Sequence, residues 1–361
     1  MRIPEEVQSL LVVKLSSIGD VVQSLPVAAA LRRRFPRAYI AWAVKPAAAD
    51  VVIGNPHLNG TFVLGGGDRS CAAASVLPPL SAPIRLARAL RQHRFELAID
   101  MQGLLKSALI ARLSGAPARI GFRNHQEGAF LLNNLAIVPD RRDIHAVDAY
   151  LGFAEAVGAP THPLDFTIAT AESDRQAVDG LLGDQRDLVA LIPGARWLSK
   201  RWAPTRFAAV ADAVADESGC MSAVVGARGD AALAAEIAAS AHVPILDLTG
   251  KTTLKQLAEF FRRCRAVVSN ETGPMYIASA VGAPTVAIFG PTDANRLGPY
   301  GEGHAKVTAN IGCRPCRLRS CQPLRCMDAV SVDQVLAAVR QVVRQSPVGG
   351  GVCQRASTSP A

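Results

Sequence analysis

The stretch LVVKLSSIGDVVQSLP, residues 11–26, decides the fold class. Its apolar start is typical of a buried strand, and the pattern VVQSLPVAAALRRRF that follows is helical. The loop SSIGD between them has one glycine, where a dinucleotide-binding turn would have three. A loop between a parallel strand and its helix lies where ligands bind. The first functional question is therefore the role of Asp20 in that loop.

The rest of the chain repeats this strand-to-helix alternation in two series, separated by a polar stretch at about residues 159–187. The first series predicts strands at 10–15, 39–44, 61–65, 96–101 and 118–122, with helices at 27–35, 83–93, 104–115 and 146–158. The second predicts strands at 188–194, 220–227, 244–250, 265–270 and 285–290, with helices at 204–216, 230–241, 253–264, 274–282 and 332–343. Composition predicts a loop at 65–83, and Ser331 with Gln334 forms a capping box for the last helix.

Two such series predict an α/β protein with two Rossmann-like parallel-sheet domains. We place them at residues 1–165 and 180–345, followed by a disordered tail at 346–361. The loops SSIGD, PGARWLSK, SNETGP and FGPTD all follow strands, in different domains. The sequence therefore predicts a binding site in a cleft between the two domains.

The formal net charge of the 361 residues is +9, but the basic residues are dispersed and mostly end apolar helices. No platform of aromatic and basic residues is visible, which argues against a single-stranded nucleic acid partner. The first ten residues, MRIPEEVQSL, lack the apolar core of a signal peptide, and no apolar run reaches the ~18 residues of a membrane span. We therefore expect a soluble, cytoplasmic protein that could still contact a membrane peripherally.

Two strand-end segments have the chemistry of a phosphate site. SNETGPMY, residues 269–276, opens a helix whose free amides, with the Thr272 hydroxyl and the bare Gly273, suit a phosphate; an ordinary N-cap explains it equally well. PGARWLSKRW, residues 193–202, carries Arg196, Lys200 and Arg201, which could neutralise a diphosphate or be solvated loop charges. No two aspartates lie two residues apart, so the sequence lacks an Asp-x-Asp pair for a divalent metal.

Four cysteines form a second pattern, CRPCRLRSCQPLRC, at Cys313, Cys316, Cys321 and Cys326. The spacing C-x2-C-x4-C-x4-C is compatible with a metal or iron–sulfur site, with reduced thiols packed in a loop, or with a disulfide. Cys220 and Cys264 are predicted to be core residues.

Taken together, these segments resemble the bacterial lipopolysaccharide heptosyltransferases of glycosyltransferase family 9. The stretches that carry the resemblance are VVKLSSIGDVVQSLP, IDMQGLLKSALIARL, RIGF with HAVDAYL, SNETGPMYIASAVGAPTVAIFGPTD and CRPC…C…CM. They run in the family's order over about residues 9–328. IDMQGLLKSALIARL and HAVDAYL look most like heptosyltransferase I, the enzyme that adds the first heptose.

The resemblance implies a GT-B fold with an acceptor-binding N-terminal domain and a donor-binding C-terminal domain. It also implies an inverting, metal-independent and cofactor-free transfer of heptose from ADP-L-glycero-β-D-manno-heptose to a Kdo residue on lipid A. We therefore expect these two substrates as partners, peripheral contact with the cytoplasmic face of the inner membrane, no nucleic acid, and a monomer.

The site residues follow from the same resemblance. Asp20 matches the general base, and Lys200 the lysine that contacts the donor phosphates. The other donor-binding positions implied are Arg196, Asp230, Thr252, Glu271, Thr272, Gly273 and Tyr276. The candidate acceptor contacts come instead from their position near N-domain strand ends, where each could equally be a surface charge: Lys14, Gln102, Lys106, Arg119 and Arg123.

Glu271 and Tyr276 depart from the family's pattern of Asp-Thr-Gly followed by histidine. These departures concern the donor sugar more than the transferase class. Alternatives left open are a transferase for another nucleotide sugar or a later heptose, a nucleotide-binding oxidoreductase, and a metal- or redox-sensing protein built on the cysteines. The oxidoreductase would need a G-x-G-x-x-G turn after a strand, which SSIGD lacks.

Overall fold

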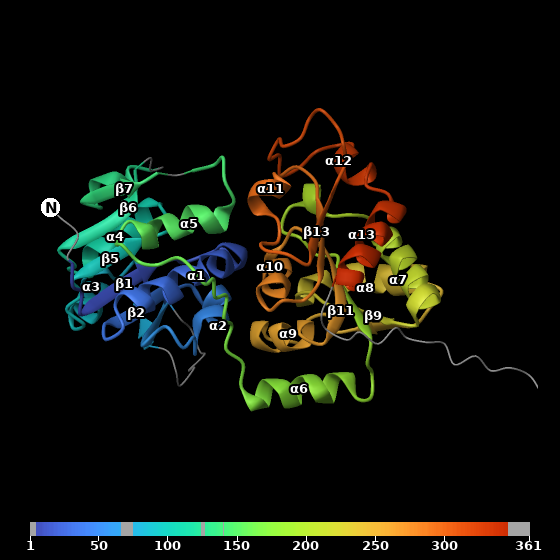
Figure 1. The fold of residues 1–361 in the computed structure, drawn as a ribbon, viewed down its shortest axis with the longest axis horizontal. Helices are drawn as coiled ribbons and strands as arrows, with labels where there is room; N and C mark the ends of the chain where they lie inside the picture. The colour runs from blue at the N-terminus through green and yellow to red at the C-terminus, as the bar shows by residue number, and fades with distance from the viewer. Residues whose placement is uncertain (1–4, 66–74, 124–126, 140, 346–361) are drawn as a thin grey trace, which may run out of the picture. The chain divides into compact units, whose positions relative to one another are not determined.

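The computed structural model describes residues 5–65, 75–123, 127–139 and 141–345, and it divides into two units, Met1–Ala171 and Glu172–Ala361. Each unit is built on one sheet whose strands run parallel, with helices flanking them (Figure 1). The predicted α/β class with two Rossmann-like parallel sheets is confirmed.

The sheet of the first unit has the strand order β4-β3-β2-β1-β5-β6-β7. Its strands are β1 (Ser9–Val13), β2 (Tyr39–Val44), β3 (Gly60–Leu64), β4 (Ser75–Leu77), β5 (Leu97–Asp100), β6 (Ala118–Phe122) and β7 (Leu135–Val138). Its α-helices are α1 (Ile18–Arg34), α2 (Ala49–Val52), α3 (Pro83–Arg91), α4 (Leu105–Leu113) and α5 (Ala146–Glu155).

The sheet of the second unit has the order β10-β9-β8-β11-β12-β13. Its strands are β8 (Leu188–Ile192), β9 (Met221–Val224), β10 (Ile245–Asp247), β11 (Cys264–Asn270), β12 (Thr285–Phe289) and β13 (His304–Thr308). Its α-helices are α6 (Glu172–Leu182), α7 (Pro204–Ser218), α8 (Ala231–Ser240), α9 (Leu254–Phe261), α10 (Gly273–Ala280), α11 (Ala294–Leu297), α12 (Arg325–Asp328) and α13 (Val332–Gln345).

Continuous apolar strands arise because both faces of each sheet are covered. In β1, Leu11 and Val13 pack in a cluster with residues of α3 and α4, whereas Leu10 and Val12 point to the opposite face and are also fully buried. In the second unit, residues of α7, α8 and α13 pack on one face of the sheet. Such burial is the main favourable contribution to folding.

The strands that the sequence analysis missed, β4, β7 and β13, all lie at sheet edges. An edge strand has fewer neighbours to bury it, so its sequence need not be a continuous apolar run; HAKVT in β13 is an example. The predicted loop at 65–83 is therefore wrong for residues 75–77, which form β4, while 66–74 lie outside the described residues.

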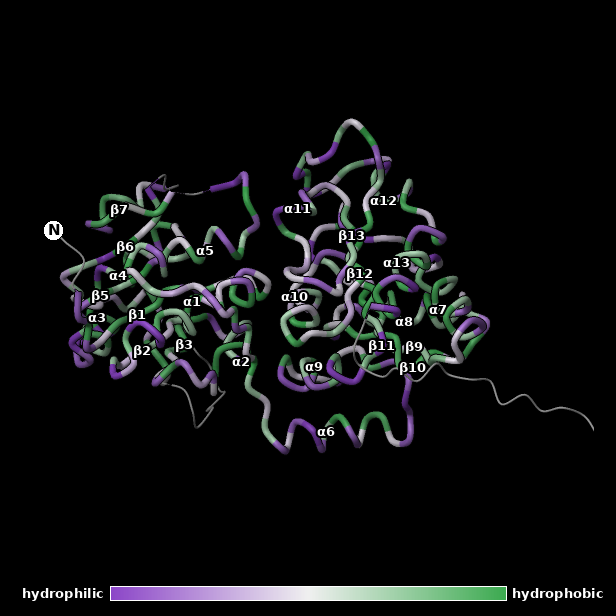
Figure 2. The backbone as a smooth tube through the Cα atoms, viewed as in Figure 1, coloured by the Kyte–Doolittle hydropathy of each residue, from purple (hydrophilic) through white to green (hydrophobic). Residues whose placement is uncertain are grey.

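The polar stretch before the second series also contains a helix, α6, which alternates hydrophilic and hydrophobic residues and buries only Val178 and Leu182 (Figure 2). At the other end, the capping box of α13 is confirmed, because the Gln334 amide donates to the Ser331 hydroxyl at 3.2 Å and the Ser331 amide to Gln334 Oε1 at 2.9 Å. The predicted disordered tail lies outside the described residues. Within the described ranges, no helix combines the length and apolarity of a membrane span.

Candidate functional site

Each sheet changes winding direction at one point, and the candidate residues follow the strands at those points. In the first unit the change falls between β1 and β5, so the loops after residues 13 and 100 meet there. In the second unit it falls between β8 and β11, so the loops after residues 192 and 270 meet there. Ligands of open parallel sheets bind outside the C-terminal ends of strands at such switch points.

The loop after β1 is closed by Asp20, which lies in the first turn of α1. Ser17 is the N-cap, and its amide and hydroxyl donate to Asp20 Oδ2 at 2.9 and 2.6 Å. Asp20 Oδ1 accepts from the Tyr150 hydroxyl of α5 at 3.2 Å. Asp20 is half-buried, so these bonds fix its orientation without enclosing it. The carboxylate is thus both part of a capping box and open to a ligand.

Electrostatics keep this carboxylate ionised. Burial would raise the pKa of Asp20, but the positive charge of Lys14, the two Ser17 bonds and the Tyr150 bond together hold that pKa below its usual value. A carboxylate that is ionised at neutral pH can accept a proton from an attacking hydroxyl.

The candidate acceptor residues of the first unit differ widely in accessibility. Lys14 is only 2% exposed. Gln102 supports the loop after β1, because its Oε1 accepts from the Leu15 and Ser16 amides at 3.1 Å each. Lys106 is half-buried in the first turn of α4, and Arg123 is exposed after β6. The Arg119 guanidinium donates to the carbonyls of Leu132 and Ala116.

In the second unit the two switch-point loops are joined by an ion pair. Lys200 Nζ lies 2.8 Å from Glu271 Oε2, and the two side chains are 14% and 6% exposed. The Thr292 hydroxyl, in the turn after β12, also donates to Glu271 Oε2. Lys200 additionally lies 4.3 Å from the centre of the Trp197 ring. Lys200 is therefore held in place, and its positively charged group lies at the C-terminal ends of the strands.

The other candidate donor residues follow neighbouring strands. Asp230, after β9, accepts from the Ala227 amide at 3.0 Å and fills the space that a side chain at Gly194 would need, because a Cβ there would lie 2.5 Å from its carboxylate. This contact explains the glycine in PGAR. Arg196 is exposed in the loop after β8, and half-buried Thr252 follows β10.

The loop after β11 begins α10 as the sequence predicts. Thr272 is the N-cap, and its hydroxyl makes no capping bond. Pro274 in the first turn has no N–H to leave unpaired. The Thr272 hydroxyl and the Gly273 amide are thus placed at a helix N-terminus, where the helix dipole favours an anion. Tyr276 is buried on α10, with its hydroxyl 3.5 Å from Glu271 Oε1.

The four-cysteine segment supports the donor loops. Its cysteines are free thiols, exposed at Cys313 and Cys316 and buried at Cys326. The amides of Cys316 and Arg317 donate to the Pro291 carbonyl at 2.9 and 2.8 Å, which ties the segment to the turn after β12. Ser199 Oγ donates to the Leu318 carbonyl at 2.6 Å. Across the part of the chain that the structure describes, no three His, Cys, Asp or Glu side chains are grouped to hold a metal ion. The predicted core cysteines, Cys220 and Cys264, are buried.

Three residues at these sites were not named as candidates from the sequence. They are Tyr150, Trp197 and Thr292, and each lies inside a stretch already singled out, namely HAVDAYL, PGARWLSKRW and FGPTD. The stretches were therefore a usable signal. No sequence signal pointed to the individual side chains. Tyr150 contacts a residue 130 positions away, and Thr292 contacts one 21 positions away.

Comparison with known proteins points to one family. A sequence profile described as glycosyltransferase family 9 (heptosyltransferase) matches residues 84–326. Lipopolysaccharide core heptosyltransferase OpsX of Haemophilus influenzae is 25% identical over 303 residues, 82% of this chain and 83% of that protein. Lipopolysaccharide heptosyltransferase 1 of Pseudomonas aeruginosa is 25% identical over 334 residues, 86% and 87% of the two chains. Heptosyltransferase 2 of Escherichia coli is also 25% identical, over 80% and 85%.

Solved structures show the same fold. A family 9 glycosyltransferase from Veillonella parvula aligns with a TM-score of 0.81 at 23% identity, over 96% of this chain and 99% of that one. The E. coli heptosyltransferase WaaC, solved with ADP-2-deoxy-2-fluoro heptose, aligns with a TM-score of 0.67 at 21% identity, over 92% and 99%.

Proposed function

Because this chain belongs to glycosyltransferase family 9 (heptosyltransferase), we propose that it transfers heptose from ADP-L-glycero-β-D-manno-heptose to a Kdo residue of the lipopolysaccharide inner core on lipid A. One observation carries the proposal. The Asp20 carboxylate is held at the switch point of the first sheet, and Lys200 is held near the N-terminus of α10 at the switch point of the second sheet. The names of the relatives support the same substrate class.

The proposed reaction is a direct displacement at the anomeric carbon. Asp20 takes the proton of the acceptor hydroxyl, the hydroxyl oxygen bonds to the anomeric carbon, and the bond to the diphosphate breaks, so that ADP leaves. Lys200 and the amide end of α10 would stabilise the negative charge that develops on the diphosphate. Attack from the face opposite the leaving group inverts the configuration. The absence of an Asp-x-Asp pair from the sequence supports metal-independent transfer.

Among the donor residues, Arg196 and Thr272 would bind the phosphates with Lys200, and Gly273 would leave room for them. Asp230 is proposed near the ribose and Thr252 near the adenine. Glu271 and Tyr276 would face the sugar, with Glu271 also holding Lys200. In the first unit, Gln102, Lys106 and Arg123 are proposed to meet the anionic acceptor.

The test is incubation of the purified chain with ADP-heptose and Kdo-lipid A, followed by product mass. We expect one heptose to be added to Kdo-lipid A that carries no heptose, and none to an acceptor that already carries the first heptose. The sequence stretches resembling heptosyltransferase I support this position, whereas the relatives include heptosyltransferase 2 at equal identity. Addition only to the heptosylated acceptor would assign the chain to a later step, and transfer from another nucleotide sugar alone would reject the donor.

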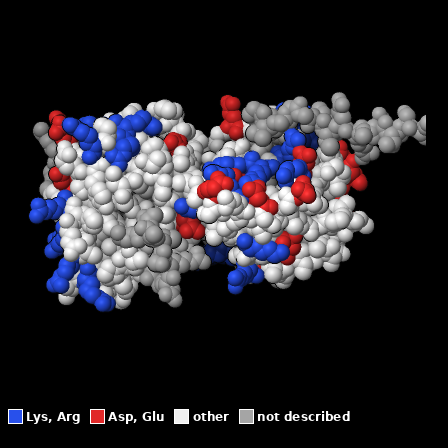
Figure 3. Space-filling view, turned by 90° about the horizontal axis from the view of Figure 1, so that it is seen from below, with Lys and Arg blue, Asp and Glu red and all other residues white. Residues whose placement is uncertain are grey.

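We further propose that the first unit contacts the anionic membrane that holds this acceptor through α3. Leu86 and Leu90 bury one face of α3 in the core. The opposite face carries exposed arginines at 85, 88 and 91, followed by Arg94, and Lys and Arg side chains line the left edge of this unit in Figure 3. These arginines form no ion pair with another residue that the structure describes. They are available to lipid phosphates.

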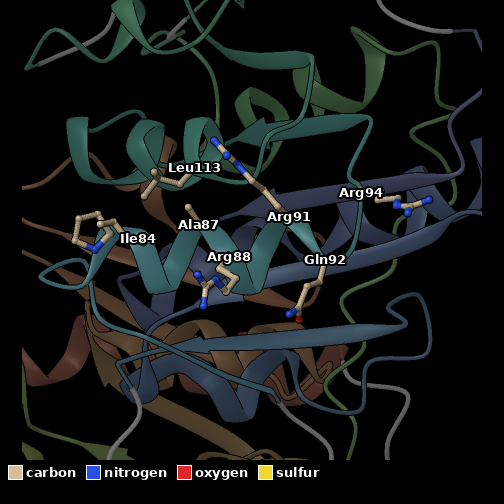
Figure 4. Close-up of a pocket in the computed structure, with 8 residues that line it drawn as sticks. Ile84, Ala87, Arg88, Arg91, Gln92, Arg94 and Leu113 are labelled. Carbon is tan, nitrogen blue, oxygen red and sulfur yellow. The ribbon is translucent and has the colours of Figure 1, made fainter.

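A surface hollow of about 830 Å³ lies along this face of α3. Its lining mixes arginines with apolar side chains and contains no acid: Pro83, Ile84, Ala87, Arg88, Arg91, Gln92, Arg94 and Leu113. Arg91 extends toward the helix that carries Leu113, whereas Arg88 points away from it (Figure 4). Ile84 is 78% exposed. Guanidiniums beside an exposed apolar side chain suit the boundary of lipid headgroups and acyl chains.

Reversing two of these charges, with Arg88→Glu and Arg91→Glu together, should lower partitioning onto phosphatidylglycerol-containing vesicles at least about tenfold, because each basic residue near an anionic surface adds attraction. Flotation of the protein with vesicles that contain or lack phosphatidylglycerol measures this partitioning. The control pair Lys255→Glu and Arg344→Glu makes the same charge change in the second unit. Equal loss in both pairs, or binding to neutral vesicles alone, would refute docking through α3.

A further inference from the structure

The candidate base is connected to a buried lysine that nothing else in the proposed reaction uses. Lys14 follows β1 and donates from Nζ to the Tyr150 hydroxyl at 2.7 Å and to the Met101 carbonyl at 3.2 Å. With 2% of its surface exposed, this ammonium has its partners inside the protein. A buried lysine is costly unless it is paired with an anion or hydrogen-bonded, so its position calls for an explanation.

The direction of the hydrogen bonds follows from the chemistry of the groups. An ammonium can only donate, so the Tyr150 oxygen must accept from Lys14. The Tyr150 hydroxyl donates its proton to Asp20 Oδ1, 3.2 Å away. The result is a polarised chain from Lys14 through Tyr150 to Asp20. It reaches Oδ1, the oxygen that the Ser17 bonds leave unused.

We propose that Tyr150 and Lys14 are positioning residues for Asp20: Tyr150 fixes the carboxylate oxygen that Ser17 does not hold, and Lys14 supplies the positive charge that keeps the carboxylate ionised. This inference rests on the proposed role of Asp20 as the base. Lys14 then acts on Asp20 from inside the protein and does not make the acceptor contact that its sequence position suggested.

The surrounding charges agree with this assignment. Among the described residues, the charged or titratable groups that act on Lys14 and Asp20 include each other, Tyr150 from α5, and Asp100 at the end of β5. Burial lowers the pKa of Lys14, while Asp20 and Asp100 oppose that change. Burial raises the pKa of Asp100, against the hydrogen bonds it accepts from Asn133 and from the amides of Gln102 and Gly103. Lys14 is thus the basic group of this cluster, acted on by two carboxyl groups, and Asp20 is the acid with the lowered pKa.

The test is the pH dependence of kcat/KM in Tyr150→Phe and Lys14→Met. In the unmodified enzyme the acid limb should lie below an ordinary aspartate pKa of about 3.9, so the profile is flat between about pH 5 and 7. Loss of the hydrogen bond or the charge raises the base pKa, which should move the acid limb upward by about one pH unit or more. We expect kcat to fall about tenfold in Tyr150→Phe, with the KM for the donor unchanged.

Tyr39→Phe is the matched control, because it also removes a phenolic hydroxyl. The Tyr39 hydroxyl, on β2, makes no hydrogen bond to Asp20 in the described structure. The acid limb of Tyr39→Phe should stay where it is in the unmodified enzyme. If Lys14→Met fails to fold, Tyr150→Phe decides alone. An unmoved acid limb in Tyr150→Phe would overturn the positioning role while leaving the transferase proposal intact. Normal turnover in Asp20→Asn would instead remove the base on which this inference rests.

Discussion

Replacing Asp20 with asparagine is expected to lower kcat about a thousandfold, the scale on which a positioned general base contributes. The amide keeps the size of the carboxylate and an oxygen that can accept from Ser17, so the start of α1 should remain folded. What is lost is the group that receives the acceptor proton. Single-turnover product formation by mass spectrometry measures the effect.

The binding of ADP separates catalysis from folding in this experiment. Asp20 belongs to the first unit and the proposed phosphate contacts to the second, so the Kd for ADP should be unchanged in Asp20→Asn. Asp50→Asn, in the first turn of α2, is the control for the same chemical change elsewhere in the unit. Near-normal turnover in Asp20→Asn would show that another group takes the proton.

Removing the cation in Lys200→Ala should have two separable consequences. Glu271, 6% exposed, would lose its ion-pair partner, and an unpaired buried charge costs about 3 kcal/mol of the free energy of unfolding. The developing diphosphate charge would also lose its stabilising cation, which should lower kcat/KM by about 10² to 10³. Denaturant unfolding and steady-state kinetics measure the two effects independently.

A double mutant distinguishes these consequences. Lys200→Met combined with Glu271→Gln removes both charges, so most of the lost stability should return while kcat/KM stays low. Recovery of activity together with stability would mean that Lys200 acts only by keeping the loops after β8 and β11 in place. A stable Lys200→Ala with normal kcat/KM would contradict both roles.

The same ion pair gives a physical meaning to one departure from the family's pattern. Glu271 reaches one methylene further than aspartate, and its Oε2 meets both Lys200 and the Thr292 hydroxyl. Lys200 is therefore held by Glu271 in the structure, and in the proposed reaction the diphosphate of the donor would share or replace Glu271 as its partner. Tyr276, in place of histidine, contributes a neutral hydroxyl at the limit of hydrogen-bond distance from Glu271.

The sequence by itself determined the two parallel sheets and the strand-end loops that hold the candidate site residues. Buried parallel strands need continuous apolar runs, so β1, β2 and β8 were legible from local composition. Because every parallel strand ends at the same edge of its sheet, SSIGD and SNETGP were placed at ligand-binding ends without coordinates. Three of the four edge strands, β4, β7 and β13, and the helix α6 were not predicted, because residues at a sheet edge or on an exposed helix need not form an apolar run.

Only the tertiary structure decided which side chains in those loops meet. From the sequence, Lys14 was a candidate acceptor contact or a surface charge after a strand, yet it is buried against Tyr150, which follows it by 136 residues. Lys200 and Glu271 likewise pair across loops 71 residues apart. A strand's two-residue period fixes which face a residue takes, but a loop has no such period. The partners of its side chains depend on how the strands are ordered in the sheet.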